Sequence, residues 1–160
     1  MLEAGSLSMH EAHMREVFAI ARRARAHGNR PFGAMLVAGN GAVLAVAENS
    51  QITDEQVLAH AEMNLLRRAV KEFTADVLAT STLYTSAEPC AMCAGAMFWS
   101  GVSRLVFGLS GDRLHEMSGF SPHMLVASAR DVLARAGRTI EIVGPVFELE
   151  AEAIFKEGEF

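Results

Sequence analysis

The stretch "LYTSAEPCAMCAGAM", residues 83–97, contains both cysteines of the chain and joins two kinds of secondary structure. The segment "TLYTS" (82–86) predicts a strand, and Pro89 can begin a helix that carries Cys90 and Cys93 and ends near Gly101. The i, i+3 spacing places both sulfur atoms on one face at the start of that helix. The N-terminal end of the helix dipole there favours the thiolate form of a cysteine.

Two cysteines alone are an incomplete metal site. In a cytosolic protein, C-x-x-C is typical of metal binding or of a redox-active pair, whereas a disulfide-rich secreted miniprotein would have more cysteines in a shorter chain. The segment "AHAEMN" (59–64) supplies His60. His60, Cys90 and Cys93 match the three protein ligands of a catalytic zinc, whose fourth position stays open to water. Glu62 lies close enough to reach that water without being a ligand.

Each of these residues also has a simpler interpretation. Taken singly, His60 is typical of a hydrogen-bonded interior histidine, Glu62 of a favourable carboxylate in a first helical turn, and the cysteine pair of a redox motif. Their combination favours zinc, because two thiolates and an imidazole suit other metals less well.

Helices and strands alternate on both sides of this stretch. A helix is predicted from Ser8, with Glu11 completing a capping box, to about Gly28. The apolar runs 34–38 and 42–47 flank Gly39-Asn40-Gly41 and predict a β-hairpin. We expect further strands at 103–109 and 139–143, helices at 59–73, 123–136 and in the tail 146–160, and irregular chain at 49–58 and 110–122. This mixture predicts an α/β fold, one central sheet with helices on both faces.

Length and composition are those of an ordinary globular protein. The 160 residues predict a single domain, 1–160, with 51% apolar and 21% charged residues. No apolar run is long enough to span a membrane, and the N-terminus lacks the order of a secretory signal, so we expect a cytoplasmic protein. The net charge of −5 argues mildly against a dedicated nucleic-acid binder.

The pattern H-x-E followed by P-C-x-x-C is the signature of zinc-dependent nucleobase deaminases. The supporting residues are "PFGAMLV" (31–37), Asn49 eleven positions before His60, "LYTSAEPCAMCAGAM" and "LVFG" (105–108). Over residues 8–120 the chain therefore resembles the cytidine/deoxycytidylate deaminase superfamily, and most of all its branch of bacterial guanine deaminases and tRNA adenosine deaminases.

The resemblance implies a three-layer α/β/α, cytidine-deaminase-like fold with a five-stranded mixed sheet, and Zn²⁺ as cofactor. It implies that Glu62 shuttles protons from water to the ring nitrogen and the leaving amine. It also implies that Asn49 hydrogen-bonds the substrate ring, that Phe32 packs against it, and that the backbone N–H of Ala61 donates to it. Core packing for Phe32 and a turn position for Asn49 are the alternatives.

The resemblance further implies a homodimer. Met97, Phe98 and Trp99 offer more apolar surface than one helix face needs, unless all three belong to the core.

Three functions remain open at this point. The favoured one is a hydrolytic deaminase of a guanine-like nucleobase or a related aminated heterocycle. The second is a tRNA adenosine deaminase, for which Arg22, Arg23, Arg25 and Arg30 could bind phosphates, although they also suit the solvated face of a helix. The third is a non-catalytic zinc domain, which the poised carboxylate of Glu62 disfavours.

Two segments bear on the substrate. Many relatives have Asp-Pro-Thr-Ala before the histidine, where this chain has Gln56-Val57-Leu58-Ala59. The tail 146–160 carries five Glu and one Lys and would repel an RNA backbone. If the tail folds over the pocket, Phe155 and Phe160 could close a small site and exclude water.

Overall fold

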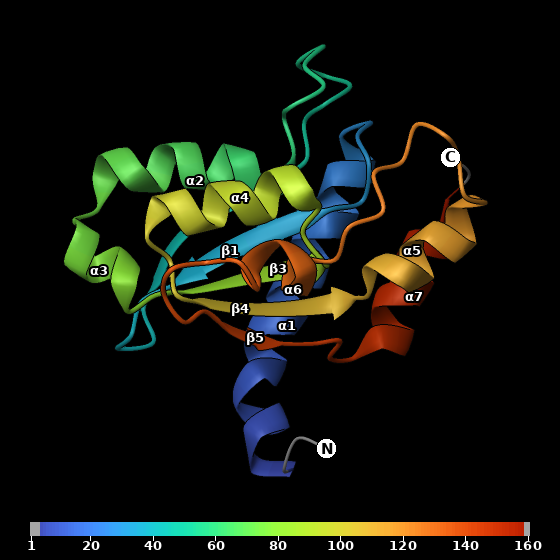
Figure 1. Cartoon of the computed structure of the whole chain (residues 1–160). Helices are drawn as coiled ribbons and strands as arrows, with labels where there is room; N and C mark the ends of the chain where they lie inside the picture. The colour runs from blue at the N-terminus through green and yellow to red at the C-terminus, as the bar shows by residue number, and fades with distance from the viewer. Residues whose placement is uncertain (1–3, 159–160) are drawn as a thin grey trace.

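The core of the protein is a five-stranded mixed sheet. A computed structural model describes residues 4–158. Within them, the strands β1 (Gly33–Val37), β2 (Val43–Glu48), β3 (Thr82–Ala87), β4 (Arg104–Leu109) and β5 (Glu141–Val143) follow the order β2-β1-β3-β4-β5. Strand β1 is antiparallel to both β2 and β3, whereas β3, β4 and β5 are parallel (Figure 1). The hairpin and all five strands expected from the sequence are present.

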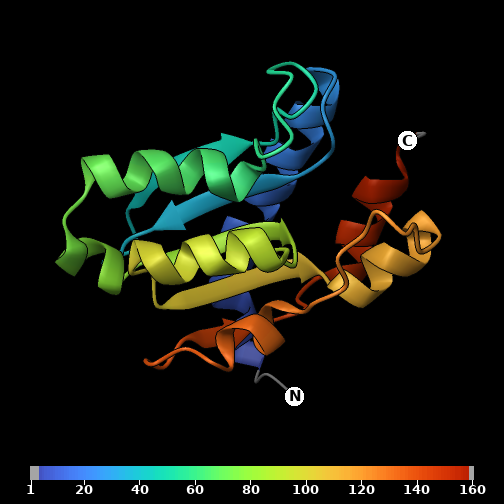
Figure 2. The same cartoon turned by 45° about the horizontal axis from the view of Figure 1, so that its top comes forward.

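Helices cover both faces of this sheet, as Figures 1 and 2 show. The helices α2 (Ala61–Glu72), α4 (Ala91–Ser100) and the short α6 (Ala129–Leu133) pack on one face, and α1 (Ala4–Ala26) and α7 (Glu148–Lys156) on the other. Alternate residues of each central strand point to opposite cores: Leu36 and Leu83 face α2 and α4, whereas Met35 and Tyr84 face α1. The three-layer α/β/α architecture is therefore confirmed. No helix in the described part of the chain has the length and apolar character that a membrane crossing requires.

The helix α1 approaches the sheet at a glycine. A Cβ added at Gly33 would lie 2.7 Å from the Val17 carbonyl oxygen and 2.9 Å from the Ala21 nitrogen, both backbone atoms of α1. Gly33 therefore lets α1 lie directly on β1, next to Phe32.

The expected capping box at Ser8 is wrong. The helix α1 already runs from Ala4, so Ser8 lies inside it, and its hydroxyl donates to the Gly5 carbonyl at 3.0 Å. A serine within a helix bonds back to the preceding turn, which makes the same residue spacing compatible with an interior position.

Three helical regions also differ from expectation. The stretch 110–122, expected to be irregular, contains α5 (Gly111–Ser118), which begins where the Ser110 hydroxyl accepts from the Arg113 N–H. The helix expected at 123–136 is reduced to α6, whose start is capped in the same way by Ser128. A short helix, α3 (Ala75–Ala79), connects α2 to β3. Serine caps thus set the starts of α5 and α6.

Candidate active site

Two helices begin side by side with unusual residues at their N-caps. His60 directly precedes α2, and Cys90 directly precedes α4. Both have extended backbone conformations, and neither side chain makes the usual capping hydrogen bond. An N-cap is normally Ser, Thr, Asp or Asn, whose side chain satisfies a free N–H group. Here the imidazole and the thiol are instead free to turn toward each other.

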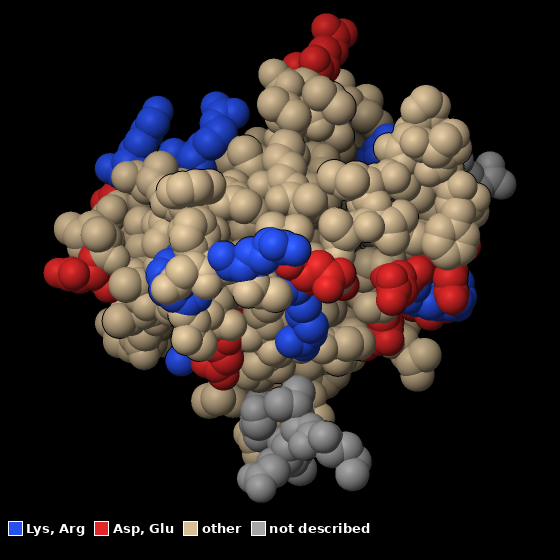
Figure 3. Space-filling view, viewed as in Figure 1, with Lys and Arg blue, Asp and Glu red and all other residues tan. Residues whose placement is uncertain are grey.

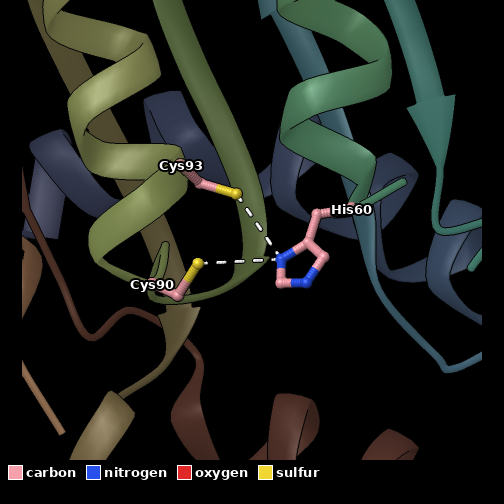
Figure 4. Close-up of side chains that lie close together, drawn as sticks. All are labelled: His60, Cys90 and Cys93. Carbon is pink, nitrogen blue, oxygen red and sulfur yellow. Dashed lines mark hydrogen bonds between the residues drawn. The ribbon is translucent and has the colours of Figure 1, made fainter. Parts of the chain in front are cut away.

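These side chains converge with Cys93, from the first turn of α4 (Figure 4). The Nδ1 atom of His60 lies 3.7 Å from the Cys90 sulfur and 3.5 Å from the Cys93 sulfur. All three ligand atoms lie within 4.8 Å of one another. Sulfur and nitrogen atoms bound to one tetrahedral zinc are about 3.6 Å apart, given the usual bond lengths. The donor set and its spacing therefore fit a zinc ion, and the three predicted ligands lie together.

The two thiols of the cluster have pKa values shifted in opposite directions. The hydrogen bond with Cys93, together with His60, lowers the pKa of the Cys90 thiol to about 4. The same bond and burial raise the pKa of Cys93. The Cys90 sulfur also raises the pKa of His60. The thiolate form of Cys90 is therefore favoured, and a divalent cation would favour the thiolate form of Cys93 as well.

Glu62 lies in the first turn of α2, beside the sulfur atoms. Its side chain is only 8% exposed, and its Oε2 is 3.6 Å from the Cys93 sulfur. Burial raises the pKa of its carboxyl group. A buried carboxyl with a raised pKa next to a metal site is suited to accept and then donate a proton.

The predicted substrate contacts border this cluster. The Ser50 N–H donates to the Ala59 carbonyl at 3.0 Å, so the end of β2 lies beside the start of α2. Asn49 is 1% exposed and its N–H donates to the carbonyl of Phe32. Ala61 is the first residue of α2, where backbone N–H groups have no acceptor within the helix.

Phe32 is half-buried and packs against both cores of the sheet. Its ring centroid is 6.1 Å from that of Phe155 in α7. Phe155 thus lies at the edge of the same region, whereas Phe160 is outside the described residues.

The residues that fix the loop between β2 and α2 were not predicted from any sequence pattern. The buried Asn29 accepts from the N–H groups of Ile52 and Thr53 through its Oδ1. Asn64 donates to the Glu48 carbonyl and the Ser50 hydroxyl. Gln51 bonds to the side chain of Asn49. Single Asn and Gln residues form no periodic pattern in the sequence, so these contacts become visible only in the folded structure.

Comparison with known proteins agrees with this geometry. A family model described as the cytidine and deoxycytidylate deaminase zinc-binding region matches residues 7–109. A probable cytosine deaminase of Schizosaccharomyces pombe is 43% identical over 143 residues, 88% of this chain and 86% of the relative. A tRNA-specific adenosine deaminase of Bacillus subtilis is 40% identical over 102 residues, 64% of this chain and 63% of the relative.

Among solved structures, the guanine deaminase from Nitrosomonas europaea matches with a TM-score of 0.77 and 29% identity, over 92% of this chain and 82% of that one. Because the matching region spans both helix starts that carry the imidazole and the sulfur atoms, the chain belongs to the zinc-binding cytidine and deoxycytidylate deaminase family.

Proposed function

We propose that the chain, acting as one domain, hydrolyses the exocyclic C–N bond of a guanine-like nucleobase or related aminated heterocycle. The amine leaves as ammonia and a carbonyl replaces it. The observation that carries this proposal is the three-ligand cluster with the buried carboxyl of Glu62 beside it. A purely structural zinc would have four protein ligands and no use for such a carboxyl.

Each residue of the site has its own role in the proposed reaction. His60, Cys90 and Cys93 would hold Zn²⁺, which when bound supplies a Lewis acid that lowers the pKa of water. Glu62 takes a proton from the attacking water and delivers it to the ring nitrogen. It then carries the second water proton, from the hydroxyl now bonded to the ring carbon, to the departing amine, which leaves as ammonia. Asn49 and the Ala61 N–H hold the ring by hydrogen bonds, and Phe32 packs against it.

Charge near the site favours a free base over tRNA. Arg22 pairs with Glu157, and Arg23 with Glu48. Arg25 donates to the carbonyls of Ile154 and Phe155. Three of the four arginines considered for phosphate binding are therefore engaged within the chain.

The loop between β2 and α2 adds negative charge at the same end. Its exposed acidic residues are Asp54 and Glu55, and Figure 3 shows acidic atoms at the tip of this loop. The exposed cations of α2 lie in its second half, away from His60. This acidic tip would repel a phosphate backbone that passes beside it.

The test is ammonia release from a panel of guanine, cytosine, adenine and their nucleosides, beside inosine formation in tRNA. We expect turnover of a free base, guanine-like, and no inosine. Robust inosine formation with no free-base turnover would establish the tRNA alternative. Ammonia release from cytosine alone would support the deaminase reaction but contradict the proposed guanine-like substrate.

We also propose a homodimer. Met97 is fully buried and Phe98 packs on the core, so these two belong to the single chain. Trp99 is 84% exposed, with Phe98 at its edge. Met92 and Gly95, at helical spacing from Trp99, are only partly buried and leave room for a second helix to approach.

A further inference from the structure

The Asn49 amide uses only half of its hydrogen-bonding capacity within the chain. Its Nδ2 donates to Gln51 Oε1 at 2.8 Å, and its Oδ1 accepts from the Gln51 backbone N–H at 3.1 Å. An asparagine amide has two donor hydrogens and two acceptor lone pairs. No other residue in 4–158 bonds to this side chain, so one N–H and one lone pair remain. Since Asn49 is 1% exposed, water does not readily satisfy them.

Gln51 cannot turn its own amide around. Its Nε2 donates to the Val57 carbonyl at 2.8 Å, and a carbonyl accepts only from a donor. This bond directs Oε1 of Gln51 toward Asn49, where it requires a donor. The Gln51 backbone N–H, in the same way, requires an acceptor. Both bonds form only when Nδ2 of Asn49 faces Oε1 of Gln51 and Oδ1 of Asn49 faces the Gln51 backbone N–H.

The loop that carries Gln51 is itself fixed at both ends. The Asn29 side chain accepts from the next two backbone N–H groups, Ile52 and Thr53, at 3.1 and 3.0 Å. The Gln51 carbonyl accepts from the Gln56 N–H at 3.0 Å, which closes the loop toward Val57. The orientation of Gln51 therefore rests on the folded loop and does not need a ligand.

We propose that Gln51 is a positioning residue, which fixes the direction in which Asn49 presents its remaining N–H and lone pair to the substrate base. The inference rests on the proposed role of Asn49 as a substrate contact. A rotation of the Asn49 amide by 180° would exchange donor and acceptor, and a base edge that fits one arrangement would meet two mismatches in the other. Gln51 thus helps to select the base without touching it.

The kinetic test compares Gln51→Met with Gln56→Met. The first substitution removes the bonds to Asn49 Nδ2 and to Val57 at nearly constant volume. The second removes a loop bond of similar length, from the Leu58 N–H to Gln56 Oε1, and leaves Asn49 alone. We expect Gln51→Met to raise KM for the preferred base about tenfold, with kcat within about twofold, since a substrate hydrogen bond contributes equally to ground state and transition state. Gln56→Met should leave both constants unchanged, and zinc content should equal the wild type in both variants.

A double-mutant cycle decides whether Gln51 acts through Asn49. In an Asn49→Ala background, Gln51→Met should have no further effect on KM, because the amide it orients is gone. If the two effects multiply instead, Gln51 serves only the stability of the loop and the inference is wrong, although the deaminase function stands.

A readout without substrate separates the inference from the proposed function. The side-chain amide protons of Asn49, followed by ¹⁵N NMR, should exchange slowly in the wild type and in Gln56→Met, and clearly faster in Gln51→Met. Equal exchange in all three proteins would overturn the inference, even if a base is turned over. Slow exchange that depends on Gln51 would uphold the orienting role, even if no base in the panel reacts and the proposed function fails.

Discussion

His60 and Cys90 show how a single position can serve chemistry at the expense of local stability. Each occupies an N-cap position without the usual capping hydrogen bond. A missing cap costs about 0.5–2 kcal/mol of helix stability. Metal binding can offset such a loss, because ligand binding to the folded state adds to folding free energy. The loss of two capping bonds is therefore explained if both residues bind a metal ion.

Replacing Cys93 by Ala should remove zinc and stability together. Cys93 is fully buried, and its loss leaves two ligands. We expect zinc, measured by mass spectrometry of the digested protein, to fall from about one per chain to less than about 0.1, with a lower Tm. Met92→Ala, in the same turn, should keep the metal. Full zinc occupancy in Cys93→Ala would rule out the ligand assignment.

Glu62→Gln separates binding from proton transfer. Gln keeps the size of the side chain but cannot accept a proton, so zinc should stay while kcat falls by about 10²–10⁴. The matched control is Glu72→Gln at the exposed end of the same helix, which should keep full activity. A rate above about a tenth of the wild type in Glu62→Gln would exclude Glu62 as the proton shuttle.

The contact between α1 and β1 depends on one missing side chain. Ala at position 33 would place its Cβ against two backbone atoms that cannot move independently of α1. We expect Gly33→Ala to lower the free energy of unfolding by about 2–3 kcal/mol in urea titrations. Gly5→Ala, where a Cβ meets nothing within 4 Å, is the control and should not destabilise. Equal stability of the two variants would show that α1 can shift.

The helix α7 is joined to α5 by charged contacts. Arg113 bonds to both carboxylate oxygens of Glu152, at 2.9 and 2.7 Å, and Glu148 accepts from the Ser110 N–H at 2.9 Å. The expected helical tail is confirmed, but these bonds and those from Arg25 hold it against the body of the protein.

This pairing predicts a pH dependence. The bond from Arg113, with Lys156, lowers the pKa of Glu152 from 4.5 to about 2. Because the folded-state pKa is depressed, the contribution to stability is present above pH 4.5 and is lost as the pH falls toward 2. The carboxyl carbon of Glu152, followed by NMR, should titrate near pH 2 and move toward 4.5 in Arg113→Gln. An unchanged midpoint in that variant would show that the pair does not form.

The assembly of the layers is what brings the two helix starts together. His60 and Cys90 are thirty residues apart, and they meet because α2 and α4 lie side by side on one face of the sheet (Figure 2). The outer face of α4 then points away from the core, with the single tryptophan of the chain upon it.

If this face forms the dimer, light scattering at micromolar concentration should give twice the chain mass of 17.2 kDa. Trp99→Ser should lower the mass to that of a monomer. Leu149→Ser, at a residue of α7 that is also 84% exposed, should leave the dimer intact. Because Trp99 is the only tryptophan, its fluorescence should be shielded from acrylamide in the dimer. A monomeric wild type with a fully quenchable tryptophan would contradict this interface.

Much of the fold and of the candidate metal site could be predicted from the sequence. Alternating and apolar runs predicted the five strands, and the spacing of His60, Glu62, Cys90 and Cys93 predicted the metal site, because periodicity and ligand chemistry are properties of short segments. Contacts between residues far apart in the chain determined the features that the sequence did not predict. The segment 110–122 is helical where Ser110 meets Glu148, the helix expected at 123–136 is short, and Asn49 is oriented by a loop that Asn29 and Val57 hold. A hydrogen bond between residues far apart in the chain leaves no local pattern, so its effect becomes visible only when the backbone has folded.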